Sequence, residues 1–207
     1  MSYFITLEGI EGVGKTSILP VIEAWFKQRQ MSIVLTREPG GTYIGEQVRD
    51  ILLSAHNQTL TSDAELLLMF AARAQHIMQV IQPALAQGKI VLSDRFIDAS
   101  FAYQGGGRGV AQTRIEHLVE WLQPQLVPNL TILLDAPVDV ALHRMHQRGK
   151  LDRFEQEQTT FFERVRNCYL QRAAQFPDRI KVIDAQLPLE QVSQLVEQLL
   201  ATKFNNA

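Results

Sequence analysis

The chain has 207 residues, of which 20 are Lys or Arg and 22 are Asp or Glu; its formal net charge is −2, and 46% of its residues are hydrophobic. This near balance of charge excludes a polybasic nucleic-acid-binding or membrane-surface protein as the default class, and the hydrophobic content excludes a disordered chain. The single cysteine, Cys168, excludes an internal disulfide and a cysteine-based zinc site, so we expect a cytoplasmic protein without membrane or nucleic-acid partners.

Short apolar runs alternate with longer segments of helical periodicity along the chain. The runs predicted to be strands are Tyr3–Leu7, Ser32–Thr36, Lys89–Ser93, Leu130–Leu134 and Arg179–Ile183. Apolar residues at helical spacing separate them, including one long segment from Thr61 to Gln87. Strands that alternate with helices form parallel sheets with helices on both faces. The pattern therefore predicts a single α/β domain over residues 1–207, with a central parallel sheet of about five strands.

A glycine-rich motif connects the first predicted strand to the first predicted helix. The stretch Gly9-Ile10-Glu11-Gly12-Val13-Gly14-Lys15-Thr16 matches G-x-x-x-x-G-K-[ST] in full. In such a loop the backbone N–H groups converge on phosphate oxygens, the lysine reaches the β and γ phosphates, and the hydroxyl suits Mg²⁺. A glycine-rich turn with a chance lysine is the alternative, but the strand before and the helix after favour nucleotide binding. The motif predicts a P-loop NTPase fold that binds ATP through residues 9–16.

Two further segments indicate a second anion or base site, although each has a plainer interpretation. Arg37 follows the second strand in Thr36-Arg37-Glu38-Pro39-Gly40-Gly41, where its guanidinium offers a fork for a phosphate; the alternative is a turn with a solvated ion pair. Phe70 and Arg73 lie three residues apart on one helix face, where a ring can stack on a nucleobase and a guanidinium can donate to a carbonyl. The plainer interpretation is a core phenylalanine and a surface arginine.

The third segment follows the Lys89–Ser93 strand. Asp94 ends this strand, where a carboxylate can act on Mg²⁺ or on an attacking oxygen, and Arg95 beside it can clamp the phosphate of an acceptor. An aspartate that ends a strand at a turn is the alternative. Three consecutive glycines, Gly105–Gly107, follow Tyr103 and Gln104, and they predict a backbone that approaches a neighbour closely.

Taken together, these motifs resemble the bacterial type of thymidylate kinase. The resemblance rests on Leu7–Thr16, Thr36–Thr42, Ser93–Phe96, Ala102–Gly109 and Arg148–Arg153, which follow the order and spacing of that family from about Tyr3 to the final helix. It implies transfer of the ATP γ-phosphoryl group to dTMP, with Mg²⁺ as cofactor, in a homodimer. Phe96 stands where relatives more often have Tyr or His, and Ser100 stands where a threonine is frequent.

The resemblance also implies roles for individual residues. Phe70 would stack on thymine, Arg73 would donate to its carbonyl, and Gln104 would line the base pocket with Ser100. Arg95 and Arg37 would hold the dTMP phosphate, Tyr103 would crowd the sugar 2′ position, and Glu11 would accept from the 3′-hydroxyl. Thr16 and Asp94 are the expected metal residues. Lys15, Asp94, Arg95, Arg148 and Arg153 are the expected catalytic residues.

A basic segment after the helix near Pro137 is predicted to be a mobile lid over residues 144–157. The phosphate loop has no basic residue at its variable positions, so positive charge for the moving phosphoryl group must come from elsewhere. Arg144, Arg148, Lys150 and Arg153 supply it, with Arg144 assigned to ATP; a solvated basic loop is the alternative. Two other functions stay open from the residues alone, a kinase for another nucleoside monophosphate and a nucleotide-binding regulatory module without phosphoryl transfer.

Overall fold

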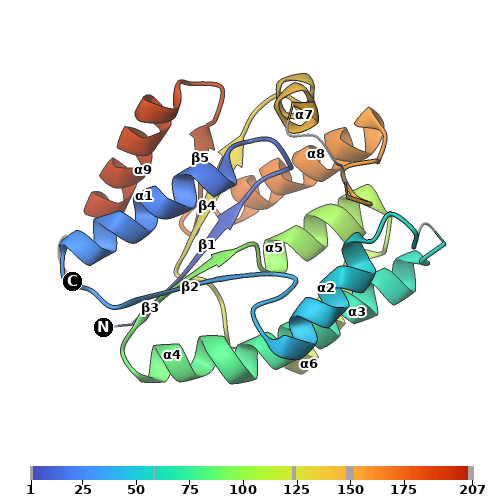
Figure 1. Cartoon of the computed structure of the whole chain (residues 1–207), viewed down its shortest axis with the longest axis horizontal. Helices are drawn as coiled ribbons and strands as arrows, with labels where there is room; N and C mark the ends of the chain where they lie inside the picture. Colours follow the sequence, from blue (N-terminus) through green and yellow to red (C-terminus); the bar gives the residue numbers. More distant parts are fainter. Residues whose placement is uncertain (1, 58, 123–124, 148–151, 205–207) are drawn as a thin grey trace.

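The computed structural model describes residues 2–57, 59–122, 125–147 and 152–204 (Figure 1). In these ranges it forms one sheet of parallel strands in the order β2-β3-β1-β4-β5. The strands are β1 (Tyr3–Glu8), β2 (Ile33–Arg37), β3 (Ile90–Asp94), β4 (Leu130–Asp135) and β5 (Ile180–Asp184). Each predicted strand is confirmed to within one residue at either end. The α/β fold with about five parallel strands is therefore confirmed.

The strand register brings the predicted functional segments to one edge of the sheet. Asp94 at the end of β3 pairs with Leu7 of β1 on one side and with Arg37 of β2 on the other. The phosphate loop that follows β1 therefore leaves the sheet beside the segment that follows β3. Ligands of open parallel sheets bind at this carboxyl edge.

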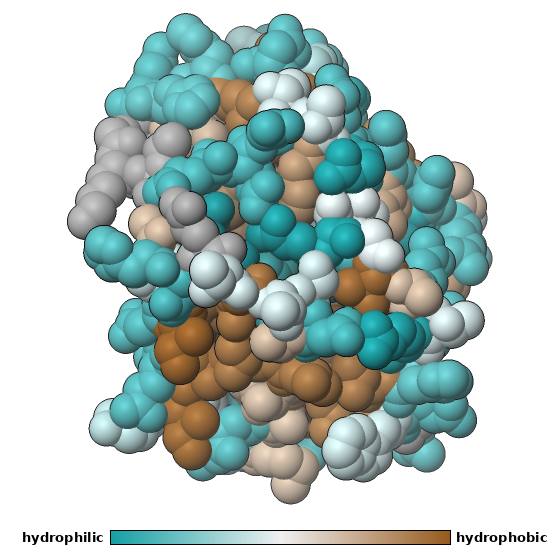
Figure 2. Space-filling model, turned by 90° about the vertical axis from the view of Figure 1, so that its right-hand side faces the viewer, coloured by the Kyte–Doolittle hydropathy of each residue, from teal (hydrophilic) through white to brown (hydrophobic). Residues whose placement is uncertain are grey.

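Helices cover both faces of the sheet (Figure 1). They include α2 (Tyr43–Leu53), α5 (Ile97–Ser100), α6 (Gln112–Leu122), α7 (Val138–His146) and α8 (Thr159–Gln175). Seen from the right-hand side of Figure 1, apolar side chains gather over the lower part of the molecule (Figure 2). No helix in the described ranges has both the length and the apolar character needed to cross a membrane.

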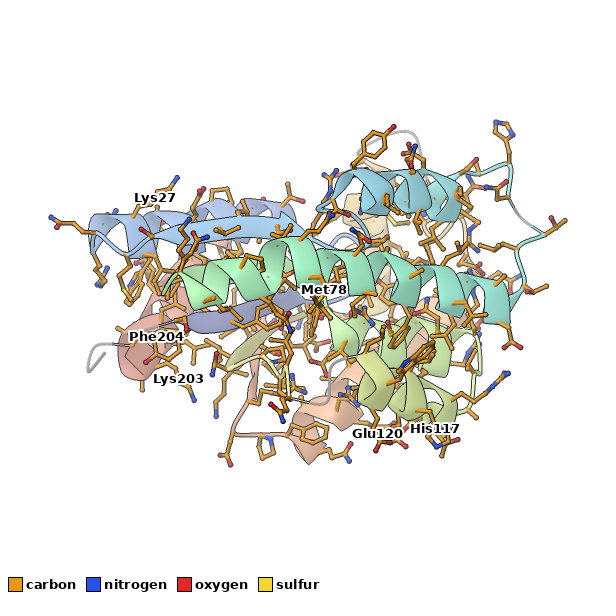
Figure 3. The ribbon with its side chains drawn as sticks, turned by 90° about the horizontal axis from the view of Figure 1, so that it is seen from below. Lys27, Met78, His117, Glu120, Lys203 and Phe204 are labelled. Atoms are coloured by element: carbon orange, nitrogen blue, oxygen red, sulfur yellow. The ribbon has the colours of Figure 1, made fainter. Side chains whose placement is uncertain are left out.

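One long helical row runs along the lower side of the molecule in Figure 1. It consists of α3 (Ser62–His76), the π-helical segment η1 (Ile77–Ile81) and α4 (Gln82–Ala86). In the view from below, Met78 lies at the middle of this row (Figure 3). Helix α6, which carries His117 and Glu120, lies beside the row in the same view. The row confirms the predicted long helix of residues 61–87, with one π segment inside it.

Helices α1 (Lys15–Gln28) and α9 (Leu189–Phe204) pack against each other on the opposite side. Phe204, at the end of α9, contacts both β1 and α1 (Figure 3). Its ring centroid lies 4.7 Å from that of Tyr3 and 5.5 Å from that of Phe26. Aromatic contacts of this kind bury a large apolar area and fix the angle between the elements. They hold the end of the chain against β1 and against the helix that begins in the phosphate loop.

The glycine run packs against helix α8. These glycines belong to η2 (Phe101–Gly107), a second π-helical segment, in which the N–H of Arg108 bonds the carbonyl of Tyr103 at 2.9 Å. A Cβ on Gly107 would lie 2.5 Å from the Phe161 ring of α8. The predicted close approach is confirmed, and the neighbour is a helix. The Tyr103 ring of η2 also packs against α8, with its centroid 6.1 Å from that of Phe161 and 6.3 Å from that of Tyr169.

Candidate active site

The phosphate loop adopts a backbone that only glycine accepts easily. Gly12 has a φ of 79°, and a Cβ on it would overlap with the Ala141 carbonyl of α7. The loop is therefore pressed between β1 and α7, and it opens helix α1 at Lys15. Ile10 and Val13 are buried in the core on either side of Gly12. This anchoring leaves the N-terminus of α1, with its partial positive charge, at the carboxyl edge of the sheet.

Lys15 is buried inside this loop. Its Nζ donates to the carbonyls of Gly9 at 2.8 Å and Ile10 at 3.1 Å. Burial, followed by repulsion from Arg95, lowers the pKa of Lys15 from 10.5 to about 8, although Asp94, Glu11 and Glu8 oppose this. The ammonium group thus lies in a site that lacks enough negative charge of its own. A bound phosphate would supply that charge.

Arg95 ties the phosphate loop to the segment after β3. Its Nη2 donates to Glu11 Oε1 at 2.6 Å and to the Tyr103 hydroxyl at 2.9 Å, and that hydroxyl donates to Glu11 Oε2 at 2.6 Å. Burial alone would raise the pKa of Glu11, but Arg95, Lys15 and Tyr103 together lower it. The three side chains form a closed triangle around one ionised carboxylate.

The backbone at Arg95 is held in a rare conformation. Its φ is 70°, a left-handed value that is uncommon for a residue with a side chain. Three hydrogen bonds fix it: the Arg95 N–H donates to Leu7 O at 3.0 Å, its carbonyl accepts from Ser93 Oγ at 2.7 Å, and the Phe96 N–H donates to Glu8 Oε1 at 2.8 Å. The guanidinium therefore leaves the sheet in a fixed direction.

A cavity opens next to this triangle. It is lined by residues from the phosphate loop, α2, α3, the segment after β3, η2 and the segment before α8; these are Glu11, Glu38, Pro39, Arg49, Leu53, Met69, Arg73, Arg95, Phe96, Ala99, Ser100, Tyr103, Gln104, Asp152 and Phe154. Three arginines and three carboxylates of this set surround a partly apolar floor. Such a cavity suits a ligand with an anionic end and a flat polar ring.

Arg73 crosses the floor of the cavity and is 2% exposed. Its Nε donates to Glu38 Oε2 at 2.7 Å, its Nη1 to Ser100 Oγ at 3.0 Å and its Nη2 to the Phe96 carbonyl at 3.1 Å. Glu38 in turn contacts His76 Nδ1 at 2.9 Å. A guanidinium with five N–H donors keeps some of them for a ligand after these three contacts.

Comparisons with known proteins agree with this arrangement. The family model described as thymidylate kinase matches residues 7–196. A thymidylate kinase from Pseudomonas putida (strain W619) is 52% identical over 197 residues, which cover 95% of each chain, and one from Neisseria meningitidis (serogroup A, strain Z2491) is 53% identical over 201 residues, which cover 97% of each. The chain belongs to the thymidylate kinase family. A crystal structure of thymidylate kinase from Ehrlichia chaffeensis aligns with a TM-score of 0.78 and 35% identity, over 96% of this chain and 98% of that one.

Membership of the thymidylate kinase family makes this chain a nucleotide kinase, a phosphotransferase, and confirms the P-loop fold. Within that frame the structure brings together most of the predicted acceptor residues. Glu11, Arg73, Arg95, Ser100, Tyr103 and Gln104 all line the cavity described above. Lys15 lies close enough to Arg95 for the two charges to shift the pKa of the lysine. The structure therefore places the phosphate loop and these predicted acceptor residues together at one edge of the sheet.

Arg37, predicted to hold the acceptor phosphate, lies outside the lining of the cavity. Its side chain is 53% exposed and donates to Glu46 Oε2 at 2.8 Å, while Glu46 Oε1 accepts from the Gly41 N–H at 2.8 Å. Arg37 therefore fastens the Pro39–Gly41 turn to α2, and it does not line the cavity. The plainer interpretation, a turn with a solvated ion pair, is the one that the structure supports.

Arg49 lines the cavity instead, and sequence analysis missed it. Its Nη1 donates to the Pro39 carbonyl at 2.9 Å, and burial, together with the charges of Arg37 and Arg95, lowers its pKa. A lowered arginine pKa marks an excess of positive charge that an anion would relieve. The signal was the helix after the turn, because Arg49 and Leu53 lie four residues apart and so share one face.

Phe70, to which the resemblance assigns base stacking, lies behind the cavity lining and contacts Arg73. Its ring is 2% exposed and lies in the core, 4.7 Å from the guanidinium carbon of Arg73, and it is not part of the cavity wall. Met69 lines the cavity in its place. The reason is helical geometry, since Met69 and Arg73 are four residues apart and lie on one face more closely than two residues three apart.

Arg153, predicted to be a lid arginine, is buried in the structure. It is 6% exposed, its Nε donates to the Leu52 carbonyl at 2.7 Å, and its Nη2 donates to Glu65 Oε2 at 2.7 Å. These contacts anchor it against α2 and α3. Arg148 lies outside the described residues. Arg144, on α7, donates to the Ala185 carbonyl at 2.7 Å after β5.

The residues present fit a divalent cation. Asp94 Oδ1 is buried and, among the described residues, has no hydrogen-bond partner. Asp94 also lies near enough to Lys15 to raise the pKa of the lysine, and Thr16 is exposed in the first turn of α1. A buried carboxylate oxygen without a donor and a free hydroxyl are both ligands that Mg²⁺ accepts.

Proposed function

We propose that this chain transfers the γ-phosphoryl group of ATP to dTMP, giving dTDP and ADP for dTTP synthesis. The observation that supports it best is the 2.6 Å contact between Arg95 Nη2 and Glu11 Oε1. Glu11 belongs to the phosphate loop, and both residues line the cavity. A donor held by the loop and an acceptor held by Arg95 therefore lie next to each other, as phosphoryl transfer in line requires.

The donor side consists of the phosphate loop and the end of α7. The backbone N–H groups of Gly9, Ile10, Glu11, Gly12, Val13, Gly14, Lys15 and Thr16 surround the ATP phosphates in this proposal. Lys15 exchanges its two carbonyl partners for phosphate oxygens and becomes fully charged again. Arg144, which lies beside the loop after β5, faces the nucleoside end of ATP.

Thr16 and Asp94 would hold Mg²⁺ in this proposal. The cation supplies charge neutralisation on the β and γ phosphates when it is bound. The unpartnered Oδ1 of Asp94 is the observation on which this assignment depends. Asp94 reaches the site because β3 ends at this residue, directly beside β1.

The acceptor side is the cavity. Arg95 and Arg49 hold the dTMP phosphate in this proposal, because these two arginines supply the unbalanced positive charge of the cavity. Tyr103 stands between Arg95 and Glu11, where its ring crowds the 2′ position of the sugar and Glu11 accepts from the 3′-hydroxyl. Arg73, Ser100 and Gln104 surround the base, and Met69 packs on its face.

We keep the proposal that residues 144–157 form a mobile lid, and we change the arginine to which it assigns the phosphoryl group. Because Arg153 is anchored on Glu65, Arg148 is the lid residue that we propose to neutralise the transferring phosphoryl group. Removal of an arginine in this role should lower kcat by about 10³-fold. A kcat of Arg148→Ala within a few-fold of the wild-type value would contradict this assignment.

We also propose that the protein forms a homodimer through the long helical row. Leu67 of α3 is 57% exposed and Met78 of η1 is 66% exposed, although both are large apolar side chains. Figure 2 shows apolar atoms gathered in the lower part of the molecule, at the height at which Figure 1 places this row. Light scattering on wild type and on Met78→Glu tests this, since the charge should yield monomers.

The activity is tested with a panel of nucleoside monophosphates in an ADP-release assay with ATP and Mg²⁺. We expect dTMP to be the best acceptor by kcat/KM, ahead of dUMP, dCMP, dGMP and dAMP. Faster phosphorylation of another monophosphate would show a kinase of different specificity. ATP binding without ADP release for any member of the panel would show a regulatory module instead.

A further inference from the structure

Glu65, in the first turn of α3, is the most heavily engaged carboxylate beside the cavity. It is 0% exposed. Its Oε1 accepts from Gln104 Nε2 at 2.8 Å, and its Oε2 accepts from Arg108 Nε at 3.1 Å and from Arg153 Nη2 at 2.7 Å. The three donors come from η2, from the residue that ends η2, and from the segment before α8. One buried carboxylate thus joins η2, which carries the cavity residue Gln104, to the segment before α8, which carries the cavity residues Asp152 and Phe154.

The contact with Glu65 decides which way the Gln104 amide points. A carboxylate accepts hydrogen bonds and has no donor, whereas a glutamine amide has two N–H donors and one acceptor oxygen. The amide nitrogen must therefore face Glu65, at the 2.8 Å distance seen. Gln104 also lines the cavity, while Glu65 does not. This contact uses one of the two N–H donors and turns the amide oxygen away from Glu65, so the oxygen is the acceptor that Gln104 offers on its other side.

Arg73, another polar side chain at the base end of the cavity, offers the opposite chemistry. Arg73 has donors only, and its position is fixed by Glu38, Ser100 and the Phe96 carbonyl. The cavity therefore shows one acceptor and one donor from two fixed side chains. A base with a ring N–H next to a carbonyl oxygen, such as thymine, matches this pair. A base with a ring nitrogen acceptor next to an amino group, such as 5-methylcytosine, mismatches it at both atoms.

We propose that Glu65 is a positioning residue for base selection: it fixes the Gln104 amide so that the cavity accepts a 4-oxo pyrimidine and rejects a 4-amino pyrimidine. This inference rests on the proposed function. Glu65 touches neither the substrate nor the reacting atoms, and it acts through Gln104. Its two arginine contacts hold the carboxylate in place, because each is a charge-assisted hydrogen bond. The same contacts anchor Asp152 and Phe154, which also line the cavity.

The test compares dTMP with 5-methyl-dCMP, because these two acceptors differ only at ring positions 3 and 4. The readout is the ratio of their kcat/KM values in wild type and in Glu65→Gln. A glutamine at position 65 presents either a donor or an acceptor, so both orientations of the Gln104 amide become satisfied. We expect the ratio to exceed about 10³ in wild type and to fall at least about tenfold in the variant. A folded Glu65→Gln protein with an unchanged ratio would overturn the proposal.

Two further comparisons make the result specific. Arg108→Gln removes another partner of Glu65 but leaves the Gln104 contact, so it should lower stability without changing the ratio. In a Gln104→Met background, Glu65→Gln should cause no further loss of discrimination, because the amide is already gone. A change of ratio in Arg108→Gln, or an additional change in the Gln104→Met background, would show that Glu65 does not act through Gln104.

Loss of the buried charge is the obvious risk, since Glu65→Gln leaves two arginines short of a partner. The double variant Glu65→Gln with Arg153→Gln removes both members of one pair and keeps the charge balanced, while Arg108 retains its contact with Glu157. It should show the same reduced ratio, and Arg153→Gln alone should show the wild-type ratio. Equal ratios in these two proteins would overturn the proposal. Failure of wild type to phosphorylate dTMP would instead reject the proposed function.

Discussion

The hydroxyl of Tyr169 donates a hydrogen bond of 2.7 Å to the carboxylate of Glu8, although the two residues are 161 positions apart. The other oxygen of Glu8 accepts from the Phe96 N–H, immediately after Arg95. Helix α8 thereby supports the strand end from which Arg95 leaves the sheet. Burial, and next the negative charge of Asp98, raise the pKa of Glu8 from 4.5 to about 8. Glu8 therefore keeps its proton to a higher pH than an ordinary carboxyl group does.

This raised pKa predicts a stability that falls with rising pH. Between pH 4.5 and pH 8 the folded state keeps a proton on Glu8 that the unfolded state releases. The free energy of unfolding should therefore decrease by at most about 1.4 kcal/mol per pH unit in this range, relative to Glu8→Gln. Urea unfolding of both proteins at pH 5, 6, 7 and 8 measures the difference. A difference that is constant or grows in favour of wild type with pH would contradict the raised pKa.

The lowered pKa of Lys15 predicts that ATP binding takes up a proton. Near pH 8.5 a large part of Lys15 is neutral in the free protein, and contact with phosphates should restore its charge. Affinity for ATP should therefore fall above pH 8. Titration calorimetry in buffers of different ionisation enthalpy measures the uptake directly. Lys15→Arg is the control, since arginine stays charged throughout this range. Uptake that is absent in wild type, or equal in the variant, would reject this coupling.

The two arginines of the Arg37–Arg49 segment should behave differently. Arg49 lines the cavity, so Arg49→Gln should raise KM for dTMP by about 10- to 100-fold through loss of a charged contact. Arg37→Gln, which breaks an exposed pair with Glu46, should leave KM within about threefold. Steady-state kinetics at saturating ATP distinguish them. The reverse order of effects would reinstate Arg37 as the phosphate-binding residue.

Met69 and Phe70 separate base contact from core packing. Met69→Ala should raise KM for dTMP about tenfold with a small loss of stability, because a half-buried side chain leaves the cavity wall. Phe70→Ala should lower the free energy of unfolding by about 3–5 kcal/mol, because a buried ring leaves the core. Thermal unfolding and dTMP kinetics on both variants decide between the two roles. A selective rise in KM for Phe70→Ala would restore its ring to the base site.

The strands and the phosphate loop were predictable from sequence because each depends on a local pattern. Apolar runs of five residues define the strands, and the spacing from Gly9 to Thr16 defines the loop. The loop needs glycine at positions such as Gly12 because of its left-handed φ, so the pattern and the geometry are inseparable. Arg95 was predictable for a similar reason, since it directly follows a strand that ends at the ligand-binding edge.

The remaining site residues depend on contacts between distant segments. Glu65 lies 39 positions from Gln104 and 88 from Arg153, and nothing in its sequence surroundings marks it as the partner of both. The sequence likewise predicts that Arg153 belongs to the lid, because it lies in the same basic segment as Arg148. Its contact with the buried carboxylate of Glu65 depends on the tertiary structure. Met69 and Phe70 are neighbours in α3, so their side chains point about 100° apart around the helix axis. Which of the two lines the cavity depends on how α3 packs on its neighbours.

The proposed activity depends above all on Arg95, which we propose to hold the acceptor phosphate next to the ATP site. Steady-state ADP release with dTMP and Mg²⁺-ATP, measured for wild type and Arg95→Gln, tests it most directly. We predict efficient dTMP-dependent ADP release by wild type, a fall in kcat/KM for dTMP of roughly 10²- to 10³-fold in the variant, and a nearly unchanged dissociation constant for ATP alone. Wild-type kinetics in Arg95→Gln, or a loss confined to ATP binding, would contradict the proposed role of Arg95 in binding the acceptor phosphate.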